Sequence, residues 1–372
     1  MSNTERCWGN VTSRLDRGAV RTFRVGISLG CLMIACAAML LTVAAWAGGS
    51  PDNPPIAPMP STACGGGAAI RTGPPGPSPV GATGVTARWA ASDNWQIAIN
   101  ATGQPKLYLT FGGDFLPSWS ENGSMLTYIH ALYYGNSYDE WKTALCVIHA
   151  DGTKPRALST GQFTDFNPTW TRDGTNRIIF NRYALRGPAS NDIYLISPQG
   201  PPGSEVLVST PENGYEWAFS GLKDGRLFID RIDWSSGHAI AKSFLLKPNP
   251  GGAPTYQEIT RPIAATQVWQ KLSVSPSETK VTYMLDNNVL YYADFDVYTA
   301  VVSNPVAITT YDSSQISEYP AWSADEAWII YDSNRSGVYQ AYAYNLAKRT
   351  TTVLSDNTAV NFQFADFEKL PK

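Results

Sequence analysis

The side chains that most often carry catalysis are few in this chain and widely separated. It has three histidines, His130, His149 and His238, and no two share the His-x-x-x-His spacing of a metal site. It has no Gly-x-Ser-x-Gly nucleophile elbow, no phosphate-binding loop ending in Gly-Lys-Ser/Thr and no Cys-x-x-Cys pair. Adjacent acids such as Asp139 and Glu140 are typical of solvated loops. We therefore predict no catalytic residue, no metal ligand and no cofactor, with calcium held by several carboxylates as the alternative.

Aromatic and cationic side chains are instead concentrated in segments that we expect to be loops. The segment 131–142 is longer than its neighbours and is rich in tyrosine and tryptophan. Rings in loops provide a large contact area at a low cost in conformational entropy, which suits a binding surface. The alternative is that the rings only cover the ends of their own strands. The candidate binding residues are Tyr133, Tyr134, Tyr138, Trp141, Arg182, Arg186, Trp234, His238 and Arg335.

The amino-terminal part of the chain has the pattern of an export signal. Residues 1–24 are basic, and residues 25–47 form an apolar segment without a charged side chain. Two outcomes fit this pattern. A signal peptide would be cleaved after Ala47, and an uncleaved segment would anchor the chain in the inner membrane. In both cases we expect the rest of the chain in the periplasm or outside the cell.

A segment rich in proline and glycine, residues 48–85, follows the apolar segment. It has little apolar surface to bury, so it cannot offset the entropy cost of ordering, and we predict a disordered linker. Of the two cysteines after Ala47, Cys64 lies in this linker and Cys146 lies in an apolar run. An oxidising compartment would permit a disulfide between them. We favour the alternative, in which Cys146 is a buried thiol and Cys64 is a linker thiol.

A repeat with a period of about 50 residues is the most informative feature of the sequence. Clear copies occur at Pro117–Gly123, Pro168–Gly174 and Pro320–Glu326, each followed by an apolar run. Two degenerate copies lie between them, around Phe219 and Val274. Each copy predicts an inner strand, a tight turn and three further short strands. We expect the anchor residues to pack between neighbouring units; they are Trp119, Trp170, Phe219 and Trp322.

These residues carry a resemblance to a known family. The pattern Pro-x-Trp-Ser-x-Asp-Gly, followed by an apolar strand and by Ser-Asn-Arg-Ser-Gly at 333–337, resembles the WD-like repeat of TolB-like β-propellers. The resemblance implies an all-β fold of four-stranded antiparallel blades over residues 86–372. The helical domain that precedes the propeller in TolB has no counterpart here, because the linker stands in its place.

The number of repeats does not by itself complete the ring. Strands expected at 87–90, 95–100 and 106–110 precede the first full copy, and 360–366 can supply an inner strand beside them. Closing the ring with strands from both ends removes the exposed edges of an open sheet. We therefore predict six blades. The loops between blades, and those between second and third strands, should then share one face, on which we place Asp114, Asp165, Glu318 and Asp332 together with the candidate binding residues.

Charge and fold together narrow the function. The net charge of −3 and the absence of long basic runs argue against a nucleic-acid surface. We predict a non-catalytic module that binds an envelope protein or a peptide. The alternative is a propeller that binds or cleaves carbohydrate, since aromatic loops with Arg182, Arg186 and His238 suit a saccharide. The membrane would be a further partner if residues 25–47 are not cleaved.

Overall fold

Short runs of branched and aromatic residues, bounded by glycine, proline and asparagine, form strands along the described part of the chain. The computed structural model describes residues 64, 71–75, 88–93, 95–101, 105–133, 141–184, 190–211, 214–233, 240–249, 251–262, 269–285, 288–355 and 362–367. The chain divides into two units, Met1–Gly48 and Gly49–Lys372, and every described residue belongs to the second. No helix occurs among these described residues, so the predicted all-β class is confirmed for them.

The first complete repeat forms a four-stranded antiparallel sheet in the order β5 (Asp114–Trp119), β6 (Met125–Tyr133), β7 (Lys142–His149) and β8 (Arg156–Ala157). A bulge interrupts β5, where Leu116 has a φ of 54° and the register with β6 shifts. A tight turn then reverses the chain, with the Gly123 amide donating to the Ser120 carbonyl at 2.9 Å. Trp119, at the end of β5, is completely buried.

The later repeats supply the remaining strands. They are β9 (Thr164–Trp170), β10 (Ile178–Ala184), β11 (Ser190–Ile196), β12 (Val206–Ser209), β13 (Gly214–Gly221), β14 (Leu227–Asp233), β15 (Ile240–Lys247), β16 (Thr255–Glu258), β17 (Gln270–Val274), β18 (Lys280–Met284), β19 (Leu290–Asp296), β20 (Val301–Ala307), β21 (Ser317–Trp322), β22 (Trp328–Ser333), β23 (Gln340–Asn345) and β24 (Thr350–Val353). Strands β17–β20 and β21–β24 form two more four-stranded sheets, whereas β9–β16 belong to one eight-stranded sheet.

The prediction of six separate four-stranded blades is therefore not met. The described strands form five hydrogen-bonded sheets, and three of these have four strands. The repeats β9–β12 and β13–β16 are merged by one parallel pair, Asn191 with Tyr215. A backbone pairing of this kind depends on how closely two repeats approach each other, which spacing along the sequence does not report.

The fifth sheet joins the two ends of the propeller region. Strand β25 (Phe362–Phe367) pairs with β2 (Arg88–Asp93), which is followed by β3 (Gln96–Ala101), β4 (Pro105–Tyr108) and β1 (Arg71–Pro75). The prediction that strands from both ends close the ring is thus confirmed. Strand β1 lies inside the segment predicted to be a disordered linker, so that prediction is wrong for residues 71–75, whose backbone pairs with β4.

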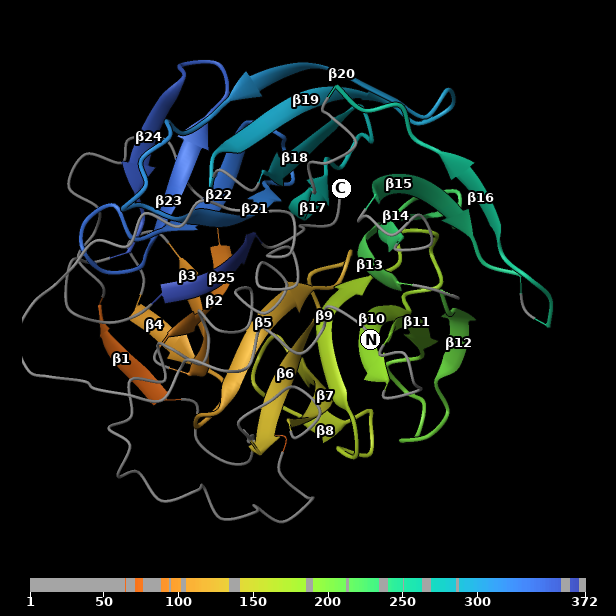
Figure 1. The fold of residues 1–372 in the computed structure, drawn as a ribbon. Helices are drawn as coiled ribbons and strands as arrows, with labels where there is room; N and C mark the ends of the chain where they lie inside the picture. Colours follow the sequence, from red (N-terminus) through yellow and green to blue (C-terminus); the bar gives the residue numbers. More distant parts are fainter. Residues whose placement is uncertain are drawn as a thin grey trace, which may run out of the picture. The chain divides into compact units, whose positions relative to one another are not determined.

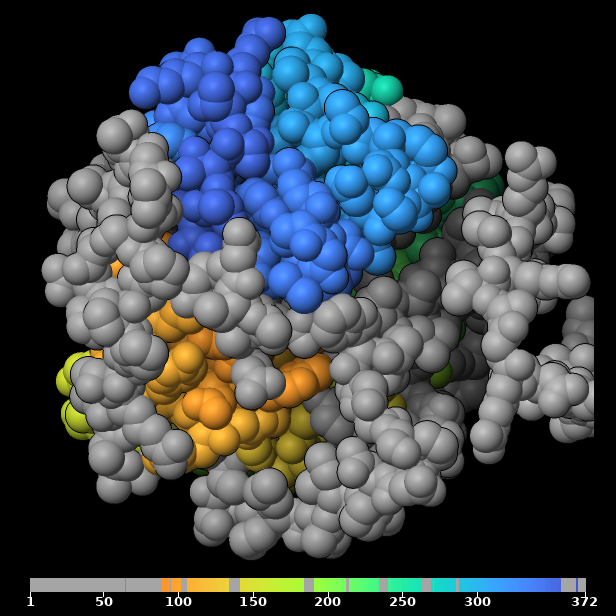
Figure 2. Space-filling model, turned by 90° about the vertical axis from the view of Figure 1, so that its left-hand side faces the viewer, coloured from red at the N-terminus to blue at the C-terminus, as the bar shows by residue number. Residues whose placement is uncertain are grey.

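Within this unit the sheets follow one another around a ring (Figure 1). The innermost strands contact each other in the cyclic order β25, β5, β9, β13, β17, β21 and again β25. Apolar side chains fill the space between neighbouring sheets; at the junction of the last and first sheets, Trp89 and Ala91 pack with Ile330 and Ala341. Figure 2 shows this side of the unit, with the blue C-terminal residues next to the orange residues that begin the propeller. Burial between sheets is the main stabilising contribution.

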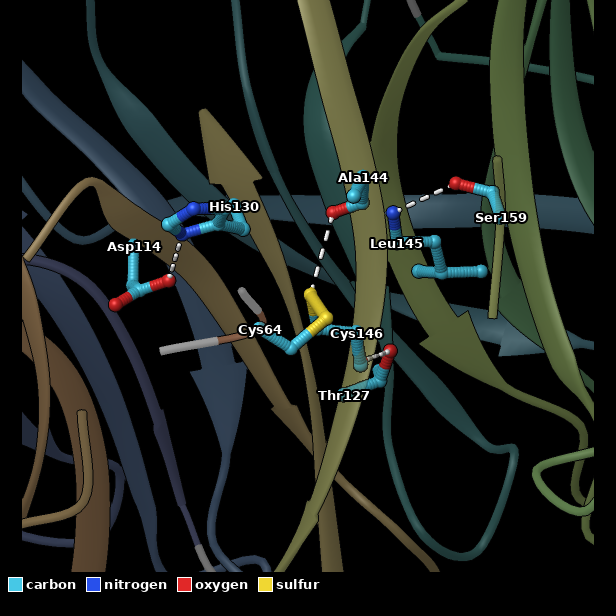
Figure 3. The surroundings of a disulfide bond; sticks show 8 residues. All are labelled: Cys64, Asp114, Thr127, His130, Ala144, Leu145, Cys146 and Ser159. Atoms are coloured by element: carbon cyan, nitrogen blue, oxygen red, sulfur yellow. Dashed lines mark hydrogen bonds and ion pairs between the residues drawn. A yellow bond between two sulfur atoms is a disulfide. The ribbon is translucent and has the colours of Figure 1, made fainter. Parts of the chain in front are cut away.

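A disulfide links Cys64, which precedes the strands of the propeller, to the first complete repeat. Cys64 and Cys146 are bonded, with their Cα atoms 5.8 Å apart (Figure 3). Cys146 lies in the middle of β7, and both cysteines are buried in a cluster that includes Ile99 and Trp119. The prediction of two unpaired thiols is therefore wrong. The two residues are 82 positions apart, and only the packing of Cys64 between two sheets brings their sulfurs together.

Among the described residues, no helix is long and apolar enough to cross a membrane. Residues 25–47, where the sequence predicts a signal peptide or an anchor, lie outside the described residues. The basic region 1–24 lies outside them as well.

Candidate functional site

One end of the sheets gathers several of the described residues that the sequence singled out. Because neighbouring strands are antiparallel, each inner strand begins where the second strand of its repeat ends. We call this end of the sheets the top face; strands β5, β9, β13, β17 and β21 begin there, and strands β6, β10, β14, β18 and β22 end there. The pairing of Asp165 with Arg182 and of Glu318 with Asp332 places these four residues at this end, as predicted.

A carboxylate and a basic side chain face each other near the start of three inner strands. Asp114 lies opposite His130, with Oδ1 and Nδ1 2.8 Å apart, and both side chains are buried. Glu216 lies opposite Arg231, whose Nε donates to Glu216 Oε1 at 2.7 Å. Asp165 and Arg182 form the third pair. Burial raises the pKa of Asp114, although its hydrogen bond to His130 acts in the opposite direction. These pairs hold the first two strands together at the top face.

Arg182 makes the most extensive of these contacts. Its Nε and Nη2 donate to the Asp165 carboxylate at 2.7 and 3.1 Å, and its Nη1 donates to Glu205 at 2.6 Å. Burial alone lowers the pKa of Arg182, but the hydrogen bonds and charges of the two carboxylates outweigh it and raise that pKa. The guanidinium also lies 4.5 Å from the centre of the Phe163 ring. Arg182 is thus buried, fully charged and placed beneath Phe163.

The inner strand β21 uses a different arrangement. Glu318 faces Asp332 instead of a cation, and Lys271 of β17 supplies the positive charge through an ion pair with Glu318. The Lys271 ammonium also lies 3.7 Å from the centre of the Tyr319 ring. Burial lowers the pKa of Lys271, and the neighbouring carboxylates of Glu318 and Asp332 oppose this shift. The pair links two sheets, because Lys271 and Glu318 belong to different repeats.

Arg335 occupies the loop after β22 and is partly exposed. Its Nη2 donates to the Tyr331 hydroxyl at 2.9 Å, and its Nε donates to Ser333 Oγ at 3.3 Å. The guanidinium lies 4.7 Å from the centre of the Tyr342 ring. In the part of the chain that the structure describes, no carboxylate forms an ion pair with Arg335. This arginine therefore brings a positive charge to the top face.

The other predicted residues have different surroundings. Tyr133 is exposed at the end of β6, whereas Trp141 is buried. The predicted anchors Trp119, Trp170 and Trp322 are buried between sheets, and Phe219 is partly buried against the core. Five predicted binding residues lie outside the described residues: Tyr134, Tyr138, Arg186, Trp234 and His238.

Two exposed rings that sequence reasoning missed join Tyr133 at the top face. The exposed fractions are 45% for Phe111, 38% for Tyr133 and 42% for Phe163. Their loops are connected: the Ala131 amide donates to the Gly113 carbonyl at 2.8 Å, and Gly161 leaves so little space that an added Cβ would lie 2.2 Å from Leu132 Cδ1. We call Phe111, Tyr133 and Phe163 the aromatic patch. A phenylalanine two or three residues before the aspartate of an inner strand is the signal that could have identified two of them.

Sequence reasoning also missed the roles of Glu216, Arg231 and Lys271. For the pairs of Asp114 and Asp165, the signal is an acid three residues before the proline of the Pro-x-Trp motif, followed by a basic residue on the next strand. Among the described residues, no three His, Cys, Asp or Glu side chains form a group that could hold a metal ion. The described pairs connect the first two strands of their repeats at the top face.

Comparison with known proteins adds information on the fold. No family model and no curated protein matches the chain. It is similar to TolB from Acinetobacter baumannii, at 12% identity and a TM-score of 0.55 over 76% of this chain and 66% of that one. It is also similar to hydrazine synthase from Kuenenia stuttgartiensis, at 12% identity and a TM-score of 0.58 over 77% of this chain and 47% of that one. A chain of a nidogen/laminin complex matches at 9% identity and a TM-score of 0.52, over 76% of this chain and 99% of that one.

The extent of these matches limits what they show. The chain spans less than two thirds of the matched TolB chain and about half of the matched hydrazine synthase chain. At such low identity the likeness concerns the fold, because unrelated functions share propeller architectures. The repeats, the closure by strands from both ends and the structural matches agree: the chain has the fold of a TolB-like β-propeller.

Proposed function

We propose that this chain is a non-catalytic binding module that contacts a protein or a peptide through its top face. The aromatic patch is the observation that carries the proposal. Phe111 and Phe163 expose their rings from two loops, and Tyr133 exposes its ring at the end of β6; these three segments are hydrogen-bonded or packed against one another. Exposed aromatic side chains on a rigid support are typical of the energetically dominant residues of an interface.

The buried pairs beneath the patch support this proposal physically. Arg182 lies under Phe163 and is itself held by Asp165 and Glu205. A ring whose support is fixed loses little conformational entropy when a partner binds. A catalytic site would instead need a nucleophile, acid or base that reaches the substrate, and the acids near the start of the inner strands at this face are buried in pairs.

We further propose that the propeller functions outside the cytoplasm, as a ring of six blades in which the eight-stranded sheet serves as two. The export pattern of residues 25–47 and the bond between Cys64 and Cys146 support the location, because disulfides persist in oxidising compartments. The matched nidogen/laminin structure is a complex of two proteins, which is consistent with a propeller that binds protein.

The test is selection of random 12-residue peptides on the immobilised full chain, followed by affinity measurements on single and double variants. We expect Phe111→Ala and Phe163→Ala each to lower the affinity for the selected peptides by about tenfold, the loss typical of one dominant interface residue. Tyr298→Ala is the matched control, because Tyr298 is 87% exposed in the turn between β19 and β20, at the opposite end of the sheets.

Two results would contradict the proposal. One is peptide binding that is equally affected by Tyr298→Ala and by the two patch variants. The other is the absence of any selected peptide while an oligosaccharide array gives binding that depends on the patch, since rings also stack on sugars. The second result would favour the carbohydrate-binding alternative.

A further inference from the structure

Three arginines in this propeller stack on a pair of aromatic rings. The guanidinium of Arg182 lies 5.4 and 4.8 Å from the ring centres of Phe180 and Tyr194, and that of Arg335 lies 5.4 and 4.7 Å from those of Tyr331 and Tyr342. Arg231 is held in the same way by two rings of its own repeat. The rings under Arg182 and Arg335 are themselves stacked, with centroids 5.6 and 5.8 Å apart. All three arginines belong to the second strand of a repeat or to the loop after it.

The three sites differ in their counter-ions. Arg182 is bound by the carboxylates of Asp165 and Glu205, and Arg231 is bound by that of Glu216. Arg335 is oriented only by neutral groups, the Tyr331 hydroxyl and Ser333 Oγ, among the residues that the structure describes. The orientation of the Arg335 guanidinium is therefore fixed, and no described ion pair neutralises its charge.

The acidic groups near Arg335 have other contacts. Asp312, on the preceding loop, accepts from the Ser314 amide and hydroxyl at 2.9 and 2.7 Å and from Gln315 Nε2 at 2.9 Å. These hydrogen bonds lower the pKa of Asp312, which stays ionised within its own turn. Glu318 is paired with Lys271, and the charge of Asp332 acts on the same lysine.

The loop that carries Arg335 is held at the top face. Asn334 donates its amide to the Ile316 carbonyl at 3.2 Å, and its Oδ1 accepts from the Ile316 amide at 2.7 Å. Ser336 and Gly337, which follow Arg335, are exposed. A ligand at the top face can therefore reach the guanidinium without unfolding of either loop.

We propose that Arg335 binds a carboxylate of an acidic peptide segment in the partner, a proposal that rests on the function proposed above. The planar guanidinium has five N–H donors, of which the described contacts use two. The remaining donors can bind a carboxylate through two parallel hydrogen bonds, and the two tyrosine rings against which the guanidinium stacks fix its orientation. A carboxylate fits better than a phosphate, because Lys271, the other described cation at this end of the two sheets, is already paired.

The experiment uses the peptides selected on the full chain at about 50 mM salt, where charge interactions are weakly screened. We expect the selected peptides to contain Asp or Glu. We expect Arg335→Gln to lower the affinity for these peptides by about 10-fold to about 100-fold, the loss expected for a charge-assisted hydrogen bond. Arg335→Lys should give an intermediate loss, because lysine keeps the charge without the planar fork. Arg349→Gln is the matched control, since Arg349 is exposed at the opposite end of the same sheet and its replacement removes the same charge.

A second measurement changes the peptide and compares its binding to the wild type and to Arg335→Gln. Replacing the acid of a selected peptide by its amide should weaken binding to the wild-type chain and have little effect on Arg335→Gln, since the two changes remove the same interaction. Peptides without acids, or acidic peptides that bind Arg335→Gln as tightly as the wild type, would overturn the role of Arg335 and leave the binding module standing. If no peptide is selected at all, the proposed function fails and the role of Arg335 fails with it.

Discussion

Asp230 is a carboxyl group that the fold buries without an ion pair strong enough to keep it charged. It lies in the middle of β14, has no exposed surface and accepts a hydrogen bond from Ser243 Oγ. Burial raises the pKa of Asp230 to about 7 from an ordinary value of 3.8, even though the charge of Arg261 and the hydrogen bond from Ser243 lower it. The folded protein therefore retains a proton here that the unfolded chain releases at low pH.

The sign of the effect on stability follows from this difference. Below about pH 3 both the folded and the unfolded chain hold the proton, and Asp230 then has no pH-dependent effect on stability. As the pH rises towards 7, the unfolded chain gains free energy from ionisation that the folded protein does not. One pKa unit corresponds to about 1.4 kcal/mol, so roughly three units amount to a loss of up to about 4 kcal/mol of stability by pH 8.

The substitution Asp230→Asn isolates this effect. Asparagine resembles the protonated acid and does not ionise, so its own cost or benefit is the same at every pH. We expect the free energy of unfolding of the variant, measured relative to that of the wild type, to be larger at pH 8 than at pH 5 by about 2–3 kcal/mol. Urea unfolding of both full chains, followed by tryptophan fluorescence at the two pH values, measures this difference.

Asp294→Asn serves as the control for this measurement. Asp294 is partly exposed, and its pKa is lowered by hydrogen bonds from Lys280 and Asn304. Its carboxyl is therefore ionised in the folded and the unfolded chain at both pH values, and its replacement should change the free energy of unfolding by the same amount at pH 5 and pH 8. If the stability difference between Asp230→Asn and the wild type is the same at pH 5 and pH 8, the buried carboxyl does not titrate as reasoned, and the argument is refuted.

Two further predictions concern stability. Breaking the disulfide, either by the double substitution of Cys64 and Cys146 with serine or by reduction after unfolding, should lower the free energy of unfolding by about 2–5 kcal/mol. The reason is that the disulfide restricts the conformations of the unfolded chain, and its loss removes this restriction. Equal urea midpoints for the oxidised and reduced chains would contradict this. Arg182→Met should lower the free energy of unfolding by about 3–5 kcal/mol, since it leaves the Asp165 carboxylate buried without its cation. Thermal unfolding at pH 7 measures this loss of stability. The double variant that also carries Asp165→Asn should recover part of it.

Several features of the fold could be predicted from local patterns. A tryptophan two residues after a proline, followed by a polar turn and an apolar run, specifies an inner strand and its hairpin because each step uses neighbouring residues only. The closing sheet was also predictable, since strands 87–110 had no inner partner and the end of the chain had one strand left over. The location of Asp114, Asp165, Glu318 and Asp332 at one end followed from the same alternation of strand direction.

The failures arose where contacts join distant residues. The disulfide needs Cys64 to enter the space between two sheets, and the eight-stranded sheet needs Asn191 to meet Tyr215. The aromatic patch was only partly predictable, because exposure depends on what covers a ring: Trp141 is buried, whereas Phe111 and Phe163 are exposed.

The sequence by itself determined the architecture, because a propeller is a repetition of one local unit and local units are encoded in consecutive residues. Tertiary structure alone decided which charges are neutralised. A bulge with a residue of positive φ shifts the register of the inner strands, and this shift sets which side chains face each other across the sheet. Arg182 and Arg335 look alike in the sequence, as single arginines near the end of a second strand. Only the folded chain brings two carboxylates to the first, and no described ion pair to the second.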